Sequence, residues 1–186
     1  HTYQVDSGSV LRADSGVSYE ILEPLAVGAF GELYKARSTA ITADSKGTPP
    51  VVVKVPWIDE HQELPEKFHQ IGNVLTVFTF EKTMMERLRG LTCVPQLLDH
   101  GRFDLRLQRS EPAFTVLFLV QEYIQGLPLR AYLDAHYSSD CRGFSGLQDA
   151  RQFISWARKL AVALIEIHQR QVVHGDIWQD NVLVTP

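Results

Sequence analysis

The chain lacks any apolar run that could cross a membrane as a helix, which takes about 20 residues. Its longest apolar run, residues 114–120 (FTVLFLV), is typical of a buried strand. Cysteine is scarce as well: Cys93 and Cys141 stand far apart and without the spacing of metal ligands, so we expect free thiols and a cytoplasmic protein. The net charge of -4 shows no basic excess, which argues against nucleic acid as a partner.

The composition is that of an ordinary globular protein, with 45% apolar and 22% charged residues among 186. Residues 1–18 are rich in serine, glycine and aspartate, so we expect a flexible lead-in there. The first residue is His1 rather than methionine, and no signal peptide is visible, so we expect a fragment of a longer protein.

Hydrophobic patterning predicts a strand-rich first half that holds one helix, followed by a helical second half. The predicted strands cover residues 19–27, the segment after the glycines up to residue 37, and residues 51–56, 94–103 and 114–123. Predicted helices cover residues 65–88, 126–137 and 149–170, and polar loops cover residues 38–50 and 104–112. The last helix carries one apolar stripe, formed by Ile154, Ala157, Leu160, Ala161, Leu164 and Ile167. The fold class is therefore α+β.

Two glycines, Gly28 and Gly31, bracket an aromatic residue, Phe30, between the first two strands. Glycine lets backbone N–H groups approach phosphate oxygens with no Cβ in the way, although a plain hairpin turn uses glycine equally well. Lys54 interrupts the apolar strand VVVKVP. It either faces solvent or points at a phosphate, and the second role needs a carboxylate to hold the lysine in place.

Glu81 can be that carboxylate, because it lies on the apolar side of the helix predicted for residues 65–88, where an unpaired charge is costly. Glu86 competes for the role, but its neighbours Arg87 and Arg89 favour a position at the surface. We therefore expect Lys54 and Glu81 to form an ion pair.

Asp176 and Asn181 lie in the closing stretch VVHGDIWQDNVLVTP, which we expect to be a loop followed by a short strand. A carboxylate there can accept the proton of a substrate hydroxyl. The oxygen of an asparagine side chain is a hard, neutral ligand suited to Mg²⁺. Both residue types are also common in solvated turns, so this pair alone does not establish a site.

These motifs occur in one order: glycine loop, strand lysine, helix glutamate, then His-x-Asp-x-x-x-x-Asn. In that order they resemble the signature of the eukaryotic-like protein kinase family, from about residue 19 to the C-terminus. The resemblance implies a protein kinase-like fold. Residues 19–122 would form an antiparallel β N-lobe with its αC helix, and residues 123–186 the hinge and the beginning of a helical C-lobe.

The resemblance also implies roles for individual residues, with ATP and Mg²⁺ as cofactors. Four residues would be catalytic, the last of them also holding Mg²⁺: Lys54, Glu81, Asp176 and Asn181. The ATP-binding residues would be Leu25, Gly28, Phe30, Gly31, Leu33, Val52, Lys54, Gln121, Glu122, Ile124 and Leu183. Among these, Gln121 takes the gatekeeper position, and the backbone of Glu122 and Ile124 would bind adenine.

Four positions depart from the family pattern. Ala26 replaces the first glycine of the loop, and Val52 replaces the usual alanine. Gly175 stands where the family has the arginine that binds a phosphorylated activation loop, so we expect no activation by that route. Trp178 stands where serine/threonine kinases carry a lysine, and the sequence HGDIW is also similar to that of aminoglycoside and fructosamine kinases.

The resemblance implies an ATP-dependent phosphotransferase, with a serine/threonine-type protein kinase as the leading hypothesis. The alternatives are a small-molecule kinase of the aminoglycoside or fructosamine kind and an inactive nucleotide-binding pseudokinase. The acceptor would be a hydroxyl group of a protein or of a small molecule. The Asp-Phe-Gly motif, which supplies the second metal ligand in the family, does not occur within the 186 residues, so we expect the chain by itself to be inactive.

Overall fold

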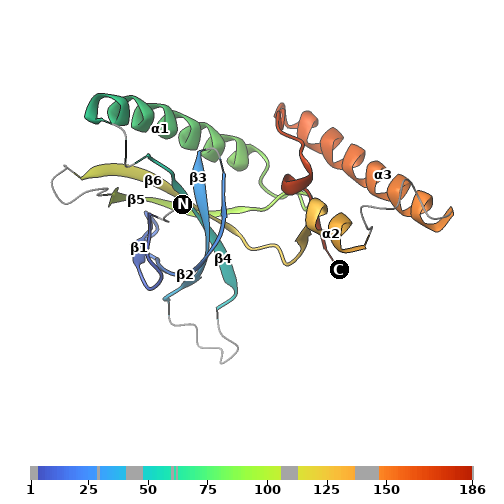
Figure 1. The fold of residues 1–186 in the computed structure, drawn as a ribbon, viewed down its shortest axis with the longest axis horizontal. Helices are drawn as coiled ribbons and strands as arrows, with labels where there is room; N and C mark the ends of the chain where they lie inside the picture. Colours follow the sequence, from blue (N-terminus) through green and yellow to red (C-terminus); the bar gives the residue numbers. More distant parts are fainter. Residues whose placement is uncertain are drawn as a thin grey trace. The chain divides into compact units, whose positions relative to one another are not determined.

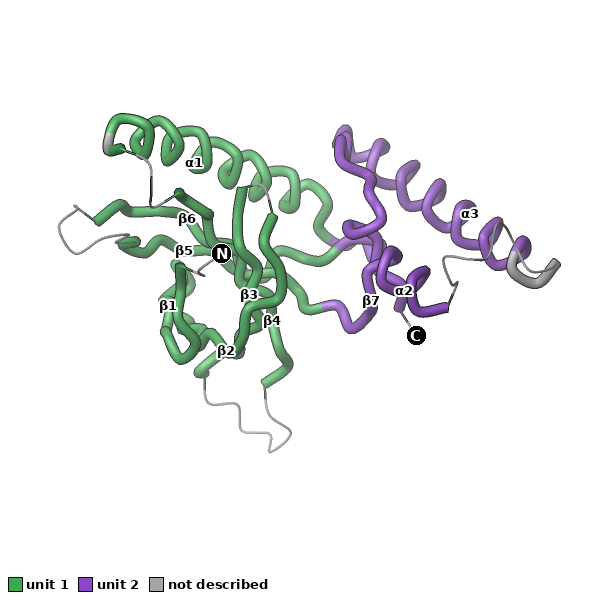
Figure 2. Tube along the Cα trace, viewed as in Figure 1, with its two compact units in different colours: residues 1–89, 95–123 green, residues 90–94, 124–186 purple. Residues whose placement is uncertain are grey.

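A computed structural model of the chain describes residues 4–28, 30–40, 48–59, 61, 63–105, 113–136 and 147–185. The chain divides into two compact units, which Figure 2 distinguishes by colour. The first unit comprises residues 1–89 and 95–123, and the second comprises residues 90–94 and 124–186. Parts of both expected polar loops, residues 41–47 and 106–112, lie outside the described residues, as does Cys141.

The first unit is built on a six-stranded antiparallel sheet (Figure 1). In the order in which they lie side by side, its strands are β1 (Val10–Arg12), β2 (Ser18–Val27), β3 (Gly31–Ser38), β4 (Pro50–Pro56), β6 (Phe114–Glu122) and β5 (Leu97–Leu105). Helix α1 (Leu64–Arg87) lies along one face of the sheet and contacts β6 more than any other strand. An antiparallel sheet with one helix packed on it is the N-lobe architecture that the sequence predicts.

The alternation of side chains along β4 explains which residues cover which face of the sheet. Val53 and Val55 are buried on the face away from α1, whereas Lys54 between them points to the helix. Strand β6 is covered on both faces, which accounts for its continuous apolar run. On the helix side, Leu117 and Leu119 pack against the α1 residues Val74 and Phe78.

The described residues before β2 are ordered, so the prediction of a flexible lead-in over residues 1–18 is wrong for residues 4–18. Val5, Leu11 and Ala13 are buried, and β1 pairs with β2. β1 also approaches β5 at the opposite edge, where the Asp14 amide donates a hydrogen bond to the His100 carbonyl at 2.8 Å. The sheet therefore curls until its two edges meet. The few apolar residues of this polar segment are buried inside the curled sheet. The composition of residues 1–18 alone does not predict that burial.

The closure of the sheet depends on close contacts between its two edges. A Cβ at Gly101 of β5 would lie 2.8 Å from the Ala13 Cα, so the approach of the two segments requires glycine there. The Tyr19 hydroxyl donates a hydrogen bond to Asp99 Oδ2 at 3.2 Å. Burial, together with this neighbouring carboxylate, raises the pKa of Tyr19 to about 12. Tyr19 is therefore a neutral donor at physiological pH.

The second unit contains two helices, α2 (Leu129–His136) and α3 (Leu147–Gln169), and a ladder of two short strands, β7 (Leu127–Pro128) and β8 (Leu183–Val184). Between α3 and β8 the chain forms a loop with one short 3₁₀ turn, η1 (Gln179–Asn181). The Leu129 amide donates to the Val182 carbonyl at 2.7 Å, which ties the start of α2 to the end of this loop. No helix among the described residues is long and apolar enough to span a bilayer.

The stripe predicted along α3 is only partly covered. Ile167 at its C-terminal end is buried, but Ile154 is 69% exposed. Ala157 and Ala161 are exposed as well. The ring of Trp156 is half-buried instead and packs edge-on against Tyr132 of α2, with 5.3 Å between the ring centroids. A tryptophan ring buries far more area than an alanine side chain. The covered face of α3 is therefore rotated towards Trp156 and away from Ala157 and Ala161.

Candidate functional site

Lys54 of β4 pairs with Glu81 of α1, as the sequence predicts. Lys54 Nζ lies 2.8 Å from Glu81 Oε1 and 2.7 Å from Oε2. The two side chains are 22% and 27% exposed, so the pair is neither fully solvated nor fully dehydrated. The ammonium group also lies 5.4 Å from the ring centroid of Phe78, which is a cation–π distance. The first unit thus presents a fixed and accessible cation.

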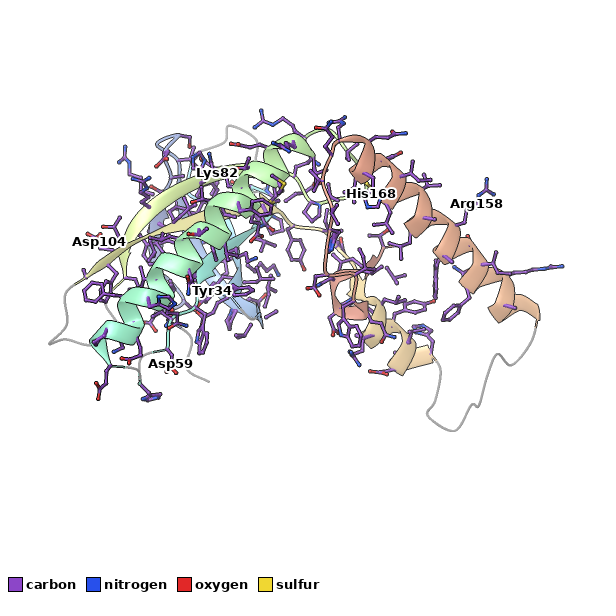
Figure 3. All side chains as sticks on the ribbon, turned by 90° about the horizontal axis from the view of Figure 1, so that it is seen from above. Tyr34, Asp59, Lys82, Asp104, Arg158 and His168 are labelled. Carbon is purple, nitrogen blue, oxygen red and sulfur yellow. The ribbon has the colours of Figure 1, made fainter. Side chains whose placement is uncertain are left out.

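Glu86, the competing candidate, has a different partner. It pairs with Lys82 at 3.0 Å, one turn earlier in α1, where Figure 3 labels Lys82. Glu81 has a further contact that the sequence did not predict. The Gln121 side-chain amide, near the end of β6, donates a hydrogen bond to Glu81 Oε1 at 3.5 Å. Glu81 is therefore held from β4 and from β6.

The turn between β2 and β3 is the predicted glycine loop. The Gly28 amide donates to the Gly31 carbonyl at 2.8 Å and closes the turn, and Phe30 is exposed at the tip. A Cβ at Gly31 would lie 2.7 Å from the Val55 carbonyl oxygen and 3.3 Å from Lys54 Cε. Glycine at position 31 is therefore required by the close approach of β3 to β4, whether or not a phosphate binds.

Apolar side chains border the ion pair on the same face of the sheet. Leu33 lies opposite Lys54 in the β3–β4 register, and Val52 lies two residues before Lys54 on β4. Both are half-buried, and Leu25 on β2 is exposed. Accessible apolar side chains beside a few polar groups are typical of small-molecule sites. Leu183, the remaining apolar residue predicted to contact adenine, lies exposed on β8 in the second unit.

At the end of β6, the backbone N–H group of Glu122 already forms a hydrogen bond within the protein. The Glu122 amide donates to the Gln96 carbonyl at 2.8 Å, and the Glu122 carboxylate accepts from the Gln96 amide at 3.3 Å. The Glu122 N–H group is therefore not available to a ligand. Gln121 and Ile124 on either side are half-buried.

Asp176 and Asn181 are brought together in the loop of the second unit. Asn181 Nδ2 donates hydrogen bonds to Asp176 Oδ2 at 2.8 Å and to the Asp176 carbonyl at 3.1 Å. The Asp176 amide donates to His174 Nδ1 at 3.3 Å. Gly175 between them has a φ of 74°, which lies in the left-handed region that favours glycine. The loop thus presents an exposed carboxylate beside an amide, a pair able to accept a proton and to ligate a cation.

Arg130 of α2 holds this loop, and sequence reasoning missed it. Arg130 Nε donates to Asp180 Oδ1 at 3.0 Å and to Oδ2 at 3.1 Å. The guanidinium carbon lies 5.4 Å from the ring centroid of Trp178, which remains 57% exposed. The two charged residues are 50 positions apart in the sequence, so no local pattern connects them.

A shallow groove along α1 is lined by other residues: Leu75, Thr76, Thr79, Phe80 and Thr83. Each threonine hydroxyl donates to a carbonyl one turn earlier in the same helix, so these hydroxyls are not free donors for a ligand. The groove contains none of the predicted site residues. In the part of the chain that the structure describes, no group of three or more histidine, cysteine, aspartate or glutamate side chains could hold a metal ion.

Comparisons with known proteins identify the family to which the chain belongs. A family model described as protein tyrosine and serine/threonine kinase matches residues 19–186. The serine/threonine-protein kinase greatwall of Danio rerio is 23% identical over 179 residues, which cover 96% of this chain and 17% of that protein. The serine/threonine-protein kinase GRIK1 of Arabidopsis thaliana is 29% identical over 136 residues, which cover 73% of this chain and 32% of that protein.

A solved structure of vaccinia related kinase 3 shares the fold. The TM-score is 0.58 at 21% sequence identity, and the match covers 100% of this chain and 48% of that one. At this level of identity the likeness concerns the fold alone. The chain spans less than half the length of each of these three relatives.

Proposed function

Because the chain belongs to the protein tyrosine and serine/threonine kinase family, we propose that it is the nucleotide-binding part of an ATP-dependent phosphotransferase. The Lys54–Glu81 ion pair carries the proposal, because it holds an accessible cation beside apolar side chains and a glycine loop. The acceptor is a serine or threonine hydroxyl of a protein, since greatwall and GRIK1 are serine/threonine-protein kinases.

The first unit would bind the nucleotide. Lys54, oriented by Glu81, would contact the α- and β-phosphates, and the backbone of residues 28–31 would cover them. The adenine ring would contact three apolar side chains of this unit, those of Leu25, Leu33 and Val52. Its edge would meet the backbone of Glu122, with Gln121 behind it and Phe30 at the tip of the loop.

Asp176 would act on the acceptor. Its carboxylate is exposed and is held by Asn181, so it can orient the acceptor hydroxyl and take its proton. As the proton moves to Asp176, the acceptor oxygen bonds to the γ-phosphorus and the bond to the β-phosphate oxygen breaks, which leaves ADP. Asn181 and Asp176 carry the oxygen donors that Mg²⁺ prefers, and Asn181 would hold this ion. When bound, Mg²⁺ would neutralise part of the negative charge on the phosphates of ATP.

A second candidate is phosphotransfer to a small molecule, and Trp178 favours it. This residue stands two positions after Asp176, where a lysine in serine/threonine kinases neutralises the transferring phosphate. The exposed indole ring instead offers a flat apolar surface beside the proposed base. A ring-shaped acceptor such as an amino sugar would suit that surface better than an extended peptide.

Two measurements test the proposed function. Titration of the 186-residue chain with ATP and Mg²⁺ should show binding. Phosphotransfer is then measured on the protein as its gene encodes it, with serine/threonine peptides and amino sugars as alternative acceptors. Asp176→Asn should lower kcat by about 10²–10⁴-fold. Asp134→Asn, a matched change of an exposed aspartate on α2, should leave kcat unchanged.

The acceptor that is phosphorylated decides between the two candidates. ATP binding without any transfer that depends on Asp176 would contradict both candidates and would identify a nucleotide-binding pseudokinase.

A further inference from the structure

Glu32 is a buried carboxylate that the proposed chemistry does not use. It follows Gly31 on β3 and is 0% exposed. The Tyr34 hydroxyl donates a hydrogen bond to Glu32 Oε2, and the Gln4 backbone amide donates to the same oxygen at 3.0 Å. The Val5 amide donates to the Tyr34 hydroxyl oxygen at 3.1 Å. A buried carboxylate needs such donors, and residues 4 and 5 supply part of this network.

Tyr34 keeps its proton under physiological conditions. Burial and the hydrogen bond to Glu32 both raise the pKa of Tyr34 above its usual range. Figure 3 labels Tyr34 on β3. The network around Glu32 therefore has a permanent donor, and it anchors the N-terminal segment to β3.

The Gln4 side chain extends from this anchor to Ile58. The side-chain nitrogen of Gln4, Nε2, donates a hydrogen bond to the Ile58 carbonyl. The Ile58 backbone amide donates in return to Gln4 Oε1 at 3.3 Å. Ile58 is buried and lies between the end of β4 and the start of α1. The next residue, Asp59, donates its amide to Gln70 Oε1 of α1 at 3.0 Å (Figure 3 labels Asp59). Gln4 thus connects β3 to the segment that leads from β4 into α1.

The two segments that Gln4 connects adjoin the proposed phosphate-binding groups, because β3 begins at Gly31 and residues 57–63 directly follow β4, the strand of Lys54. The Gly31 backbone lies against the Lys54 side chain, with only 3.3 Å between the position of an added Cβ and Lys54 Cε. The Trp57 amide donates to the Phe30 carbonyl at 3.1 Å, which ties the tip of the glycine loop to the segment that contains Ile58. A shift of β3 relative to residues 57–63 would therefore move the glycine loop relative to the end of β4, the strand that carries Lys54.

We propose that Gln4 is a positioning residue for the nucleotide, which joins Glu32 to Ile58 and thereby fixes the glycine loop over Lys54. The inference rests on the proposed nucleotide site. Gln4 precedes the residues that the family model matches, 19–186, so the family pattern does not contain it. Because the glycine loop acts on phosphates, Gln4 should affect the binding of ATP and not the binding of adenosine.

The test compares these two ligands on the 186-residue chain with Gln4→Met, a side chain of similar length that cannot make the two amide hydrogen bonds. The Kd for ATP with Mg²⁺ should rise about five- to tenfold, the equivalent of one or two net hydrogen bonds. The Kd for adenosine should change by less than about twofold. Ser7→Ala, an exposed position in the same segment, is the matched control and should change neither constant.

Amide hydrogen exchange on the nucleotide-free chain gives an independent readout. In Gln4→Met, the Trp57 amide should exchange faster than in the wild type, while the Val120 amide in the centre of β6 should be unaffected. Faster exchange at both positions would indicate general destabilisation and would overturn the positioning role.

The binding outcomes separate this inference from the proposed function. If the wild-type chain binds ATP, and Gln4→Met weakens ATP and adenosine equally or weakens neither, the positioning role is wrong and the nucleotide site stands. If the wild-type chain binds neither ligand, the nucleotide site is wrong, and the positioning role is wrong with it.

Discussion

The Arg130 Nε–H group donates a bifurcated hydrogen bond to both carboxylate oxygens of Asp180, at 3.0 and 3.1 Å. This contact joins helix α2 to the loop that contains the proposed base, Asp176. The same guanidinium lies over the ring of Trp178. An exposed ion pair contributes little to folding, roughly 0.2–1 kcal/mol. Its effect here is local: it orders an aromatic ring that remains accessible two residues from Asp176.

We predict that Arg130→Ala frees the Trp178 ring while lowering the free energy of unfolding by at most about 1 kcal/mol. The measurement is the fluorescence anisotropy decay of Trp178 in a chain with Trp57→Phe and Trp156→Phe, which leaves one of the 3 tryptophans. The decay should be faster in Arg130→Ala. It should not change in Arg158→Ala, which removes an exposed arginine of α3 (Figure 3). Equal decays in all variants would show that other contacts hold the ring.

Lys54→Met should weaken the binding of ATP with Mg²⁺ by about ten- to a hundredfold, because a hydrogen bond to a charged group contributes about 1.5–3 kcal/mol. Isothermal titration calorimetry on the 186-residue chain measures this change. Lys35→Met is the matched control, since Lys35 lies on the neighbouring strand and pairs with Glu23 at 3.1 Å. A similar loss in both variants would mean that general positive charge, and not a defined site, attracts the nucleotide.

Tyr19 should make the stability of the chain depend on pH in the alkaline range. Its pKa is raised from 10.0 to about 12 in the folded chain, so the neutral form contributes stability that is complete below pH 10.0. This contribution is lost as the pH rises towards about 12, because the phenol must then ionise beside Asp99. The difference in free energy of unfolding between wild type and Tyr19→Phe should therefore shrink above pH 10.0. A difference that stays constant through this range in urea unfolding would contradict the assignment.

Replacing either of two glycines by alanine should change the free energy of unfolding, with opposite signs at the two positions. An added Cβ meets nothing within 4 Å at Gly175 or at Gly72, so only the backbone conformation distinguishes them. Gly175→Ala should cost about 1–2 kcal/mol, because φ is 74° there. Gly72→Ala, within α1, should raise the free energy of unfolding by about 0.5–1 kcal/mol. Urea unfolding of both variants measures the two changes, and changes of the same sign would refute the argument.

The ion pair could be predicted from the sequence because each of its charges lies in an apolar pattern. Lys54 stands among the valines of β4, and Glu81 stands on the apolar side of α1, so each needed a partner. The same reasoning, that a charge in an apolar pattern needs a partner, also predicts hydrogen-bond donors around Glu32. Glu32 alternates with Tyr34 and Ala36, which are both buried, but a glutamate next to a glycine turn is usually exposed.

Other features depend on contacts between distant segments, which no local pattern contains. The strand β1 has only three residues, and its burial depends on β5, far along the chain. Arg130 and Asp180 are 50 positions apart, and they adjoin the paired strands β7 and β8. The covered face of α3 is set by the ring contact between Trp156 and Tyr132, whereas the predicted stripe weighed every apolar residue alike.

The meeting of β1 and β5 gives this sheet protection that an open sheet lacks. Edge strands carry unpaired N–H and C=O groups, which can recruit strands of other molecules and start aggregation. Here the Asp14 amide bonds to the His100 carbonyl across the two edges, and the absence of a side chain at Gly101 lets Ala13 lie against β5. A chain cut back to residue 19, where the family match begins, would expose the edges of β2 and β5 together and should self-associate through them.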